Sequence, residues 1–313
     1  MLAPRFLQMA TIGIFDSGVG GLSVFREIRR LLPTERYLYF ADNAFCPYGT
    51  KSQAFIQERA REITELLVRR GAEIIVVACN TATAAAIAAL RAEFSDAPSA
   101  ALREWSDGRL ERLCFIGMEP AVKPAALGTQ SGVIGVLATA GTLSASKYLK
   151  TRGLYEDDVR IVEHVGQGFV ELVEAGELTG AHAEEIVRES LTPLLEAGAD
   201  TIVLGCTHYP FLLETLRKVA GEFLQVGASV QAGHGQVGAS PQNIPSIRFI
   251  DPAPAVARQL LKVMDREGIF HGPAADLEGT SQEATDPQSA DLTLLSSGPT
   301  CILCDAARLL KKQ

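Results

Sequence analysis

The sequence predicts an α/β protein of two similar modules, each a mostly parallel sheet with helices on both faces. Short apolar runs alternate along the chain with amphipathic stretches, the pattern of strands and helices in such folds. Two strand-and-turn units also recur at nearly one spacing, with Ile12 and Ile134 122 residues apart and Cys79 and Cys206 127 apart. A chain of 313 residues can hold two domains with full cores. We therefore interpret the chain as a duplicated α/β module.

The expected strands are short apolar runs, most of them rich in β-branched residues, as buried parallel strands are. They are Ile12–Phe15, Tyr37–Ala41, Ile74–Ala78, Ile116–Met118, Val133–Leu137, Arg160–Val165, Thr201–Gly205 and Ile247–Asp251. The amphipathic stretches between them predict helices at Ser52–Arg70, Ala84–Glu93, Ala181–Glu196 and Pro210–Glu222. Gly71 and Gly198 follow two of these helices as C-cap signals, and a strand begins soon after each.

Three polar segments interrupt this alternation. Ser95–Arg112 is loop-like and marks a crossing between domains, while Gly227–Pro245 and the acidic Gly272–Ala290 are typical of surface insertions. We expect a first domain of residues 10–112 plus 222–313 and a second of residues 113–221, because the stretch from 222 is too short and irregular for a third domain.

Composition narrows the class of protein. The net charge of −8, with no cluster of Lys or Arg, argues against a nucleic-acid partner. No apolar stretch is long enough to span a membrane, and the first ten residues lack the apolar core of a signal peptide. Six irregularly spaced cysteines indicate free thiols in a reducing cytosol, and the lone CxxC at Cys301 and Cys304 has too few partners for a zinc site. We expect a cytoplasmic protein without a metal.

Cys79 and Cys206 each follow an apolar run, at the strand end where open α/β sheets bind ligands. A buried cysteine is more often a small hydrophobe, so the pairing needs further support. A helix expected at Ala82–Arg91 puts Cys79 near a helix N-terminus, which favours a thiolate. The lack of an arginine before Arg91 excludes the Cys-x5-Arg loop of a small phosphatase. His208 follows Cys206 by two residues, so a Cys–His hydrolase stays open as an alternative.

Two polar turns follow the first and second expected strands. Residues 16–21 (DSGVGG) lead into an expected helix at Leu22–Leu32 and could hold an anion on backbone N–H groups. They match neither a P-loop nor a dinucleotide fingerprint, and helix capping alone could explain Asp16. A small carboxylate suits this turn better than a nucleotide. Residues 42–50 (DNAFCPYGT) form the second turn, whose Pro-Tyr-Gly is a weak signal alone.

Two thiols on facing modules suit proton exchange at a stereocentre, in which one base removes a proton and one acid returns it on the opposite side. The uncharged donors near the strand ends suit a carboxylate substrate; they are Asn80, Thr81, Thr139, Thr142 and Thr207. No lysine lies in a motif for pyridoxal phosphate, so the expected chemistry uses no cofactor.

Taken together, several segments resemble the glutamate racemases, within the cofactor-independent aspartate/glutamate racemase superfamily. They are IGIFDSGVGG, FADNAFCPYGTKS, VVACNTATAAA, IGMEPAVKPAA, VIGVLATAGTLSASKY and VLGCTHYPFL, within residues 12–214. Residues 249–251 and 295–298 extend the likeness toward the end of the chain.

The resemblance implies two doubly wound α/β domains related by a pseudo-twofold duplication, with the active site between them. It implies that Cys79 and Cys206 are the catalytic acid/bases, one for each enantiomer, and that Asp16 and His208 assist them. The implied substrate-binding residues are Asp16, Ser17, Tyr48, Gly49, Asn80, Thr81, Thr139, Thr207 and His208. The implied partners are L- and D-glutamate, with a homodimer allowed, and the D-glutamate would supply peptidoglycan synthesis in a bacterium.

The chain also departs from the family pattern. An Ala-Cys-Pro that the family often carries is absent from residues 165–174 (VGQGFVELVE), which leaves open whether Glu174 serves as a site carboxylate. Aspartate racemase, a one-thiol decarboxylase, the Cys–His hydrolase and a non-catalytic amino-acid-binding protein are the alternatives. The two cysteines disfavour the decarboxylase, and Gly-Cys-Thr-His-Tyr-Pro disfavours aspartate racemase.

Overall fold

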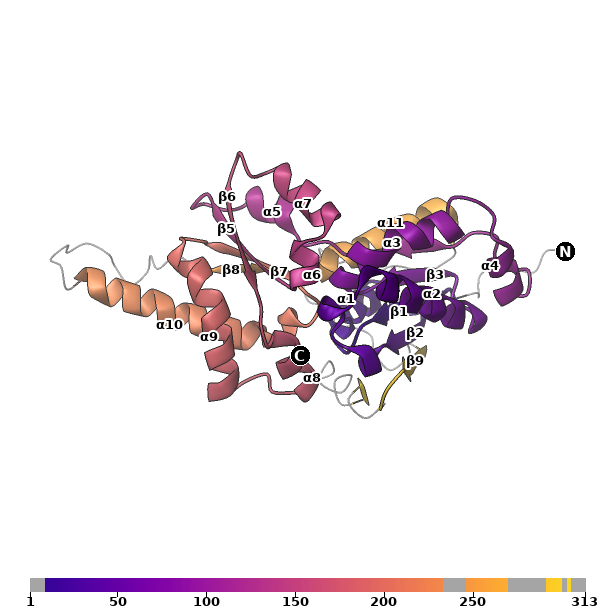
Figure 1. Ribbon diagram of the computed structural model, residues 1–313, viewed down its shortest axis with the longest axis horizontal. Coiled ribbons are helices and arrows are strands. Elements are labelled where there is room, and N and C mark those ends of the chain that lie inside the picture. Colours follow the sequence, from indigo (N-terminus) through magenta and orange to yellow (C-terminus); the bar gives the residue numbers. More distant parts are fainter. Residues whose placement is uncertain (1–8, 233–245, 270–290, 300–302, 305–313) are drawn as a thin grey trace. The chain divides into compact units, whose positions relative to one another are not determined.

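The computed structural model describes residues 9–232, 246–269, 291–299 and 303–304, with side chains described up to residue 226 in the first range. The chain divides into two compact units (Figure 1). The first comprises residues 1–118 and 253–313, and the second comprises residues 119–252.

The first unit is built on a five-stranded parallel sheet in the order β4-β3-β1-β2-β9. Its strands are β1 (Thr11–Asp16), β2 (Arg36–Ala41), β3 (Ile74–Val77), β4 (Cys114–Ile116) and β9 (Asp291–Ser296). Its helices are α1 (Leu22–Leu31), α2 (Gln53–Arg69), α3 (Asn80–Phe94), α4 (Ala100–Trp105) and α11 (Ala253–Glu267), with short 3-10 turns η1 (Asn43–Phe45) and η2 (Tyr48–Thr50).

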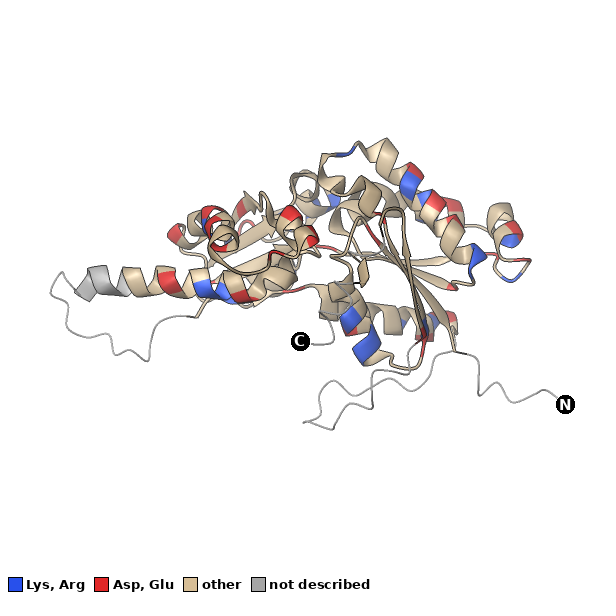
Figure 2. Ribbon diagram, turned by 90° about the horizontal axis from the view of Figure 1, so that it is seen from below, with Lys and Arg blue, Asp and Glu red and all other residues tan. Residues whose placement is uncertain are grey.

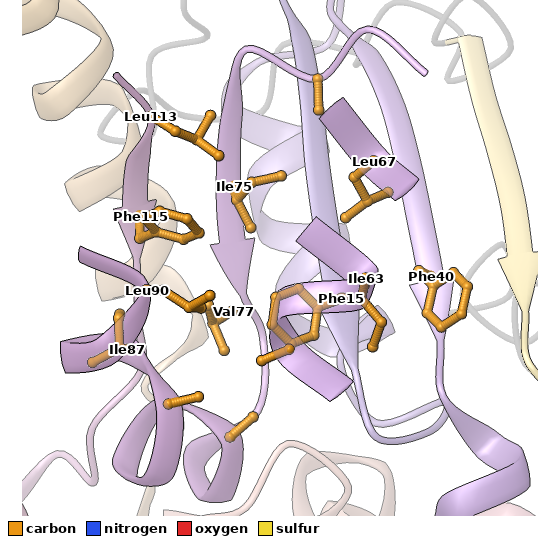
Figure 3. Close-up of a cluster of buried hydrophobic side chains, with 14 of the residues drawn as sticks. Phe15, Phe40, Ile63, Leu67, Ile75, Val77, Ile87, Leu90, Leu113 and Phe115 are labelled. Atoms are coloured by element: carbon orange, nitrogen blue, oxygen red, sulfur yellow. The ribbon is translucent and has the colours of Figure 1, made fainter. Parts of the chain in front are cut away.

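A hydrophobic core lies between one face of this sheet and helices α2 and α3 (Figure 3). Phe15 of β1 and Val77 of β3 point into it with Ile63 of α2. Ile12 and Ile14 are fully buried on the opposite face, because successive strand side chains alternate. Both faces are therefore covered, and the open ends of the strands are left to carry the polar residues.

The second unit is built on a four-stranded parallel sheet in the order β6-β5-β7-β8. Its strands are β5 (Val133–Ala138), β6 (Arg160–Val165), β7 (Thr201–Gly205) and β8 (Arg248–Ile250). Its helices are α5 (Val122–Ala126), α6 (Ala140–Leu143), α7 (Ser146–Gly153), α8 (Phe169–Ala175), α9 (Ala181–Glu196) and α10 (Leu213–Ala232), with the 3-10 turn η3 (Tyr209–Leu212).

The two sheets share one topology. When β5 to β8 are taken as counterparts of β1 to β4, both sheets run fourth, third, first, second, and β9 extends the first sheet beside β2. The first and third strands of each unit are therefore neighbours, and their carboxyl ends lie at the same sheet edge. The predicted class of two mostly parallel α/β domains is confirmed.

Three segments differ from the sequence-based expectations. The segment expected to be a loop at 95–112 contains α4, which is too short to show a helical period and is held by the buried Leu102 and Trp105. Strand β8 pairs with β7, so this part of the stretch from 222 belongs to the second sheet, whereas we expected it in the first domain. The strand β9 has no counterpart among the expected strands.

Parts of the expected insertions and the first eight residues lie outside the described residues. Helix α10 continues through Ala232, so the start of the segment at 227–245 is helical, and residues 233–245 fall outside. The segment at 272–290, residues 1–8 and Cys301 also fall outside.

Charged residues are distributed over the helices of both units, with acidic and basic positions interspersed (Figure 2). The ion pairs on the helices are mostly exposed, as for Arg69 with Glu65 and for Lys218 with Glu184. Exposed pairs contribute little to stability, so the buried cores carry the fold. Among the helices that the structure describes, none is both long and apolar enough to cross a membrane.

Candidate active site

In the first unit, Asp16 and Cys79 lie at the carboxyl ends of neighbouring strands. Phe15 of β1 is in register with Val77 of β3, and the Ala78 N–H donates to the Phe15 carbonyl at 2.8 Å. Asp16 is fully buried and Cys79 is 5% exposed. The parallel pairing thus brings together two residues that are far apart in sequence.

The turn after β1 is organised around the Asp16 carboxylate. Its Oδ1 accepts the Ser17 N–H at 2.7 Å and its Oδ2 accepts the Gly21 N–H at 2.6 Å. A side chain at Gly21 would meet the Asp16 Cβ and the Tyr39 hydroxyl, both at 2.8 Å, so only glycine fits there. Asp16 therefore caps the turn before α1. Capping does not exclude a part for the same carboxylate in catalysis.

Cys79 is the N-cap residue of α3. Its Sγ accepts the Ala82 N–H at 3.4 Å and lies 3.8 Å from the Ser17 hydroxyl. The N–H donor and the positive end of the helix dipole both stabilise negative charge on the sulfur. The structure thus gives this thiol the surroundings of an acid/base group.

The first turn of α3 carries two more buried polar residues. Asn80 is 4% exposed and Thr81 is 7% exposed. Within the described part of the chain, neither the Oδ1 nor the Nδ2 of Asn80 has a hydrogen-bond partner. A buried amide without partners costs about 1–3 kcal/mol, so these two atoms are candidates to bind a ligand.

The loop after β2 approaches the same sheet edge. The Asp42 N–H donates to the Asp16 carbonyl at 2.9 Å, and the buried Tyr48 hydroxyl donates to the Asp42 carboxylate. Burial, followed by the hydrogen bond to Asp42 and its charge, raises the pKa of Tyr48 far above its ordinary value. Tyr48 is therefore a neutral phenol, and Gly49 follows it with partial exposure.

In the second unit, Thr139 and Cys206 follow the neighbouring strands β5 and β7. Ala138 is in register with Gly205, where a Cβ would lie only 2.7 Å from the Ala138 Cβ. Thr139 caps α6 by accepting the Thr142 N–H at 3.3 Å. Cys206 is 7% exposed, and Thr207 and His208 are buried beside it.

His208 connects the Cys206 thiol to a carboxylate. Its Nδ1 lies 3.7 Å from the Cys206 Sγ, and its Nε2 lies 2.7 Å from the Glu174 Oε1 of α8. Because Glu174 accepts the proton on Nε2, the Nδ1 of a neutral ring is the nitrogen that can take a proton from the thiol. Cys206, His208 and Glu174 thus lie in a hydrogen-bonded row along which a proton can pass from the thiol to the imidazole.

Helix α8 is fixed in place by Tyr209. The Tyr209 hydroxyl donates to the Gly166 carbonyl at 3.3 Å, and its ring packs edge-on against Phe169 with centroids 4.9 Å apart. Burial, followed by the nearby Cys206, raises the pKa of Tyr209 well above its ordinary value. This packing holds the helix that presents Glu174 to His208.

Each unit therefore collects its own share of the residues singled out from the sequence. Asp16, Ser17, Cys79, Asn80 and Thr81 lie at the edge of the first sheet with the loop that carries Tyr48. Thr139, Cys206, Thr207 and His208 lie at the edge of the second sheet. The structure adds Glu174 to these residues. The sequence left its role open, because a single acidic residue on a short helix carries no motif of its own.

Comparison with known proteins agrees with this geometry. Residues 12–260 match the family model described as Asp/Glu/Hydantoin racemase. The chain belongs to the Asp/Glu/Hydantoin racemase family.

Curated glutamate racemases are similar to this chain over most of its length. That of Ectopseudomonas mendocina (strain ymp) is 44% identical over 263 residues, covering 84% of this chain and 85% of the relative. That of Pseudomonas putida (strain W619) is 42% identical over 285 residues, covering 91% and 92%.

Solved structures of glutamate racemases share the fold. Isoform RacE1 from Bacillus anthracis has a TM-score of 0.71 at 29% identity, covering 97% of this chain and 95% of that one. The Escherichia coli enzyme, in complex with L-glutamate and the activator UDP-MurNAc-Ala, has a TM-score of 0.66 at 30% identity, covering 92% and 98%.

Proposed function

We propose that this chain is a glutamate racemase that interconverts L- and D-glutamate by cofactor-independent proton exchange at the α-carbon. The observation that carries the proposal is that two units of one topology each present a buried thiol just past the third strand, with polar partners at hydrogen-bond range. The glutamate racemases at 44% and 42% identity support glutamate as the substrate.

The proposed chemistry uses one thiolate and one thiol at the same α-carbon. The thiolate takes the α-proton, and the C–H electron pair moves into the carboxylate to give an enediolate. The other thiol then delivers its proton to the opposite face of the carbon, so the two cysteines exchange protonation states. In the reverse direction the same groups act in opposite roles.

The two thiols have different support. Cys79 lies at the N-terminus of α3 and beside the Ser17 hydroxyl, and Asp16 directly precedes Ser17 in the chain. Cys206 has His208, which can hold the thiol proton on Nδ1 while Glu174 stabilises the resulting imidazolium. Both arrangements stabilise a thiolate, which is the base the reaction needs.

Neutral donors would hold the substrate. The amide of Asn80, which has no hydrogen-bond partner among the residues that the structure describes, would bind the substrate's carboxylate or amine, with Ser17, Thr81 and the Tyr48–Gly49 backbone on the same unit. Thr139 and Thr207 would contribute from the second unit, with His208. Donors directed at the carboxylate stabilise the charge that develops there in the transition state.

The Cys206–His208–Glu174 relay also resembles the nucleophile, base and orienting group of a cysteine hydrolase. That reading gives Cys79 no part in chemistry, although Cys79 is as buried as Cys206 and accepts the Ala82 N–H at the start of α3. The Cys79→Ala variant separates the two functions, because a hydrolase would keep its activity and a two-base racemase would lose it.

The direct test follows α-deuteration and optical rotation of L-glutamate in deuterated water without added cofactor. We expect wild-type exchange and racemisation, and loss of racemisation in both Cys79→Ala and Cys206→Ala. Cys114→Ala is the matched control, since Cys114 is a half-buried thiol on the edge strand β4. Absence of α-exchange in the wild type, or a single active-site variant racemising at the wild-type rate, would overturn the proposal.

The proposed setting follows from the same activity. D-Glutamate is a building block of peptidoglycan, so we place the reaction in the cytoplasm of a bacterium at an early step of cell-wall synthesis. The test expresses this chain, and separately a known glutamate racemase, in bacterial cells that need D-glutamate for growth. Equal amounts of D-glutamate in the two cultures would support that role.

A further inference from the structure

Arg59, on helix α2, makes a bidentate ion pair with Asp42 in the loop that follows β2. Its Nη2 lies 2.7 Å from Asp42 Oδ1 and its Nε lies 3.0 Å from Asp42 Oδ2. The Asp42 side chain is completely buried and that of Arg59 is 19% exposed. A planar guanidinium that grips both oxygens of a carboxylate fixes orientation as well as charge.

The same guanidinium contacts the loop at a second point. Its carbon lies 4.6 Å from the centroid of the Phe45 ring, and Phe45 packs edge-on against Phe55 of α2. Asp42 also accepts the hydroxyl proton of Tyr48. Arg59 therefore acts on the beginning and middle of the loop directly, and on its end through Asp42.

We propose that Arg59 is a positioning residue, which sets the place of Tyr48 and Gly49 by holding Asp42 and Phe45. The inference rests on the proposed function, because Tyr48 and Gly49 matter there as substrate-binding residues. Without the guanidinium, Asp42 is a buried carboxylate lacking its counter-charge. Keeping that carboxylate buried in the same place then costs free energy, and the loop loses the fixed acceptor for Tyr48.

Arg61 provides a matched control two residues further along α2. Its Nε lies 2.9 Å from Glu93 Oε1, and its guanidinium carbon lies 5.2 Å from the centroid of the Trp105 ring. It thus pairs with a carboxylate and an aromatic ring on α3 and α4, whereas Arg59 pairs with Asp42 and Phe45 of the loop and with Glu62 of its own helix. If the loss of any arginine from the surface of α2 were enough to lower activity, the two variants would lose activity equally.

The test compares Arg59→Met and Arg61→Met in steady-state racemisation of both glutamate enantiomers. We expect Arg59→Met to lose about tenfold to a hundredfold in kcat/KM, mostly through a higher KM, because misplacing a binding group costs that much. Arg61→Met should stay within about twofold of wild type. Arg59→Lys keeps the charge and loses the bidentate geometry, so its kcat/KM should lie between those of Arg59→Met and the wild type.

A second readout does not depend on activity. Cys46 lies in the loop and is partly buried, so its rate of alkylation by iodoacetamide, followed by peptide mass spectrometry, reports loop opening. We expect the rate to rise severalfold in Arg59→Met and to stay at the wild-type value in Arg61→Met. If Arg59→Met does not fold, Arg59→Lys carries both measurements.

Two outcomes would overturn the proposal. One is an Arg59 variant that folds and keeps both KM and the Cys46 alkylation rate of the wild type. The other is an equal effect of Arg59→Met and Arg61→Met. A wild-type chain that does not racemise glutamate would overturn the proposed function instead, and the alkylation rates would still decide whether Arg59 holds the loop.

Discussion

The contact between Glu174 and His208 allows a quantitative prediction about catalysis. The Glu174 Oε1 lies 2.7 Å from His208 Nε2, and the histidine side chain is 2% exposed. Replacing Glu174 by glutamine keeps an acceptor oxygen for the Nε2 proton and removes only the negative charge. The variant therefore isolates the electrostatic support for the imidazolium that would form, in the proposed mechanism, when the Cys206 thiol gives its proton to Nδ1.

The size of the effect follows from the position of the pair. Two unit charges about 4 Å apart attract each other by about 4 kcal/mol at the effective dielectric typical of protein sites. Glu174 is 18% exposed, so solvent takes part of this energy. About 2 kcal/mol remains, within the range for hydrogen bonds to charged groups. That corresponds to a roughly thirtyfold loss in rate.

The assay is racemisation of each enantiomer followed by circular dichroism. Because the two enantiomers have equal free energy, kcat/KM must fall by the same factor in both directions. Glu177→Gln is the control, since Glu177 makes a similar contact of 2.8 Å with His182 at an exposed site. If Glu174→Gln stays within about twofold of the wild type, or loses no more than Glu177→Gln, the relay does not work as described.

Two further predictions concern stability. Burial raises the pKa of four tyrosines, which are Tyr37, Tyr48, Tyr148 and Tyr209. The contribution of these tyrosines to the free energy of unfolding is fully present below the unfolded pKa of about 10. It is lost as pH rises above that value, because the unfolded chain then releases protons that the folded chain keeps. Urea midpoints should therefore fall between pH 8 and pH 10.5, and a constant midpoint would contradict this. Gly205→Ala puts a Cβ 2.7 Å from Ala138 Cβ and 3.0 Å from the Leu137 carbonyl, so we expect about 1–3 kcal/mol of destabilisation in the same titration, against little change for the open Gly153→Ala.

The sequence predicted what depends on local patterns. All eight expected strands occur, because an apolar run is visible within a few residues, although β4 covers Cys114–Ile116 and begins two residues before its expected start at Ile116. Strand β9 was missed because its outer position, beside β2 alone, allows the alternating pattern of Asp291 to Ser296 and needs no continuous apolar run. Helix α4 was missed because six residues do not complete a recognisable amphipathic period.

The candidate site divides in the same way. Asp16, Cys79 and Cys206 could be proposed from sequence, because a polar residue just past a strand has a predictable place on the sheet edge. The sequence left Glu174 open and gave no sign of Arg59, because each contacts a partner distant in sequence, His208 and Asp42 respectively. Such contacts are set by how a helix packs on its sheet, and a charged residue on a helix looks the same whether it faces solvent or a buried partner.

The duplication fixes where the thiols lie, and the loops around them decide their chemistry. Both cysteines come just after the third strand of their unit, yet one accepts a helix N–H and the other faces an imidazole. A racemase must bind two mirror-image substrates with side chains that are not mirror images. Two thiols with separate support satisfy this requirement, because each can be adjusted for the enantiomer it deprotonates without altering the other. The different surroundings of the two thiols therefore fit the two-base mechanism that we propose.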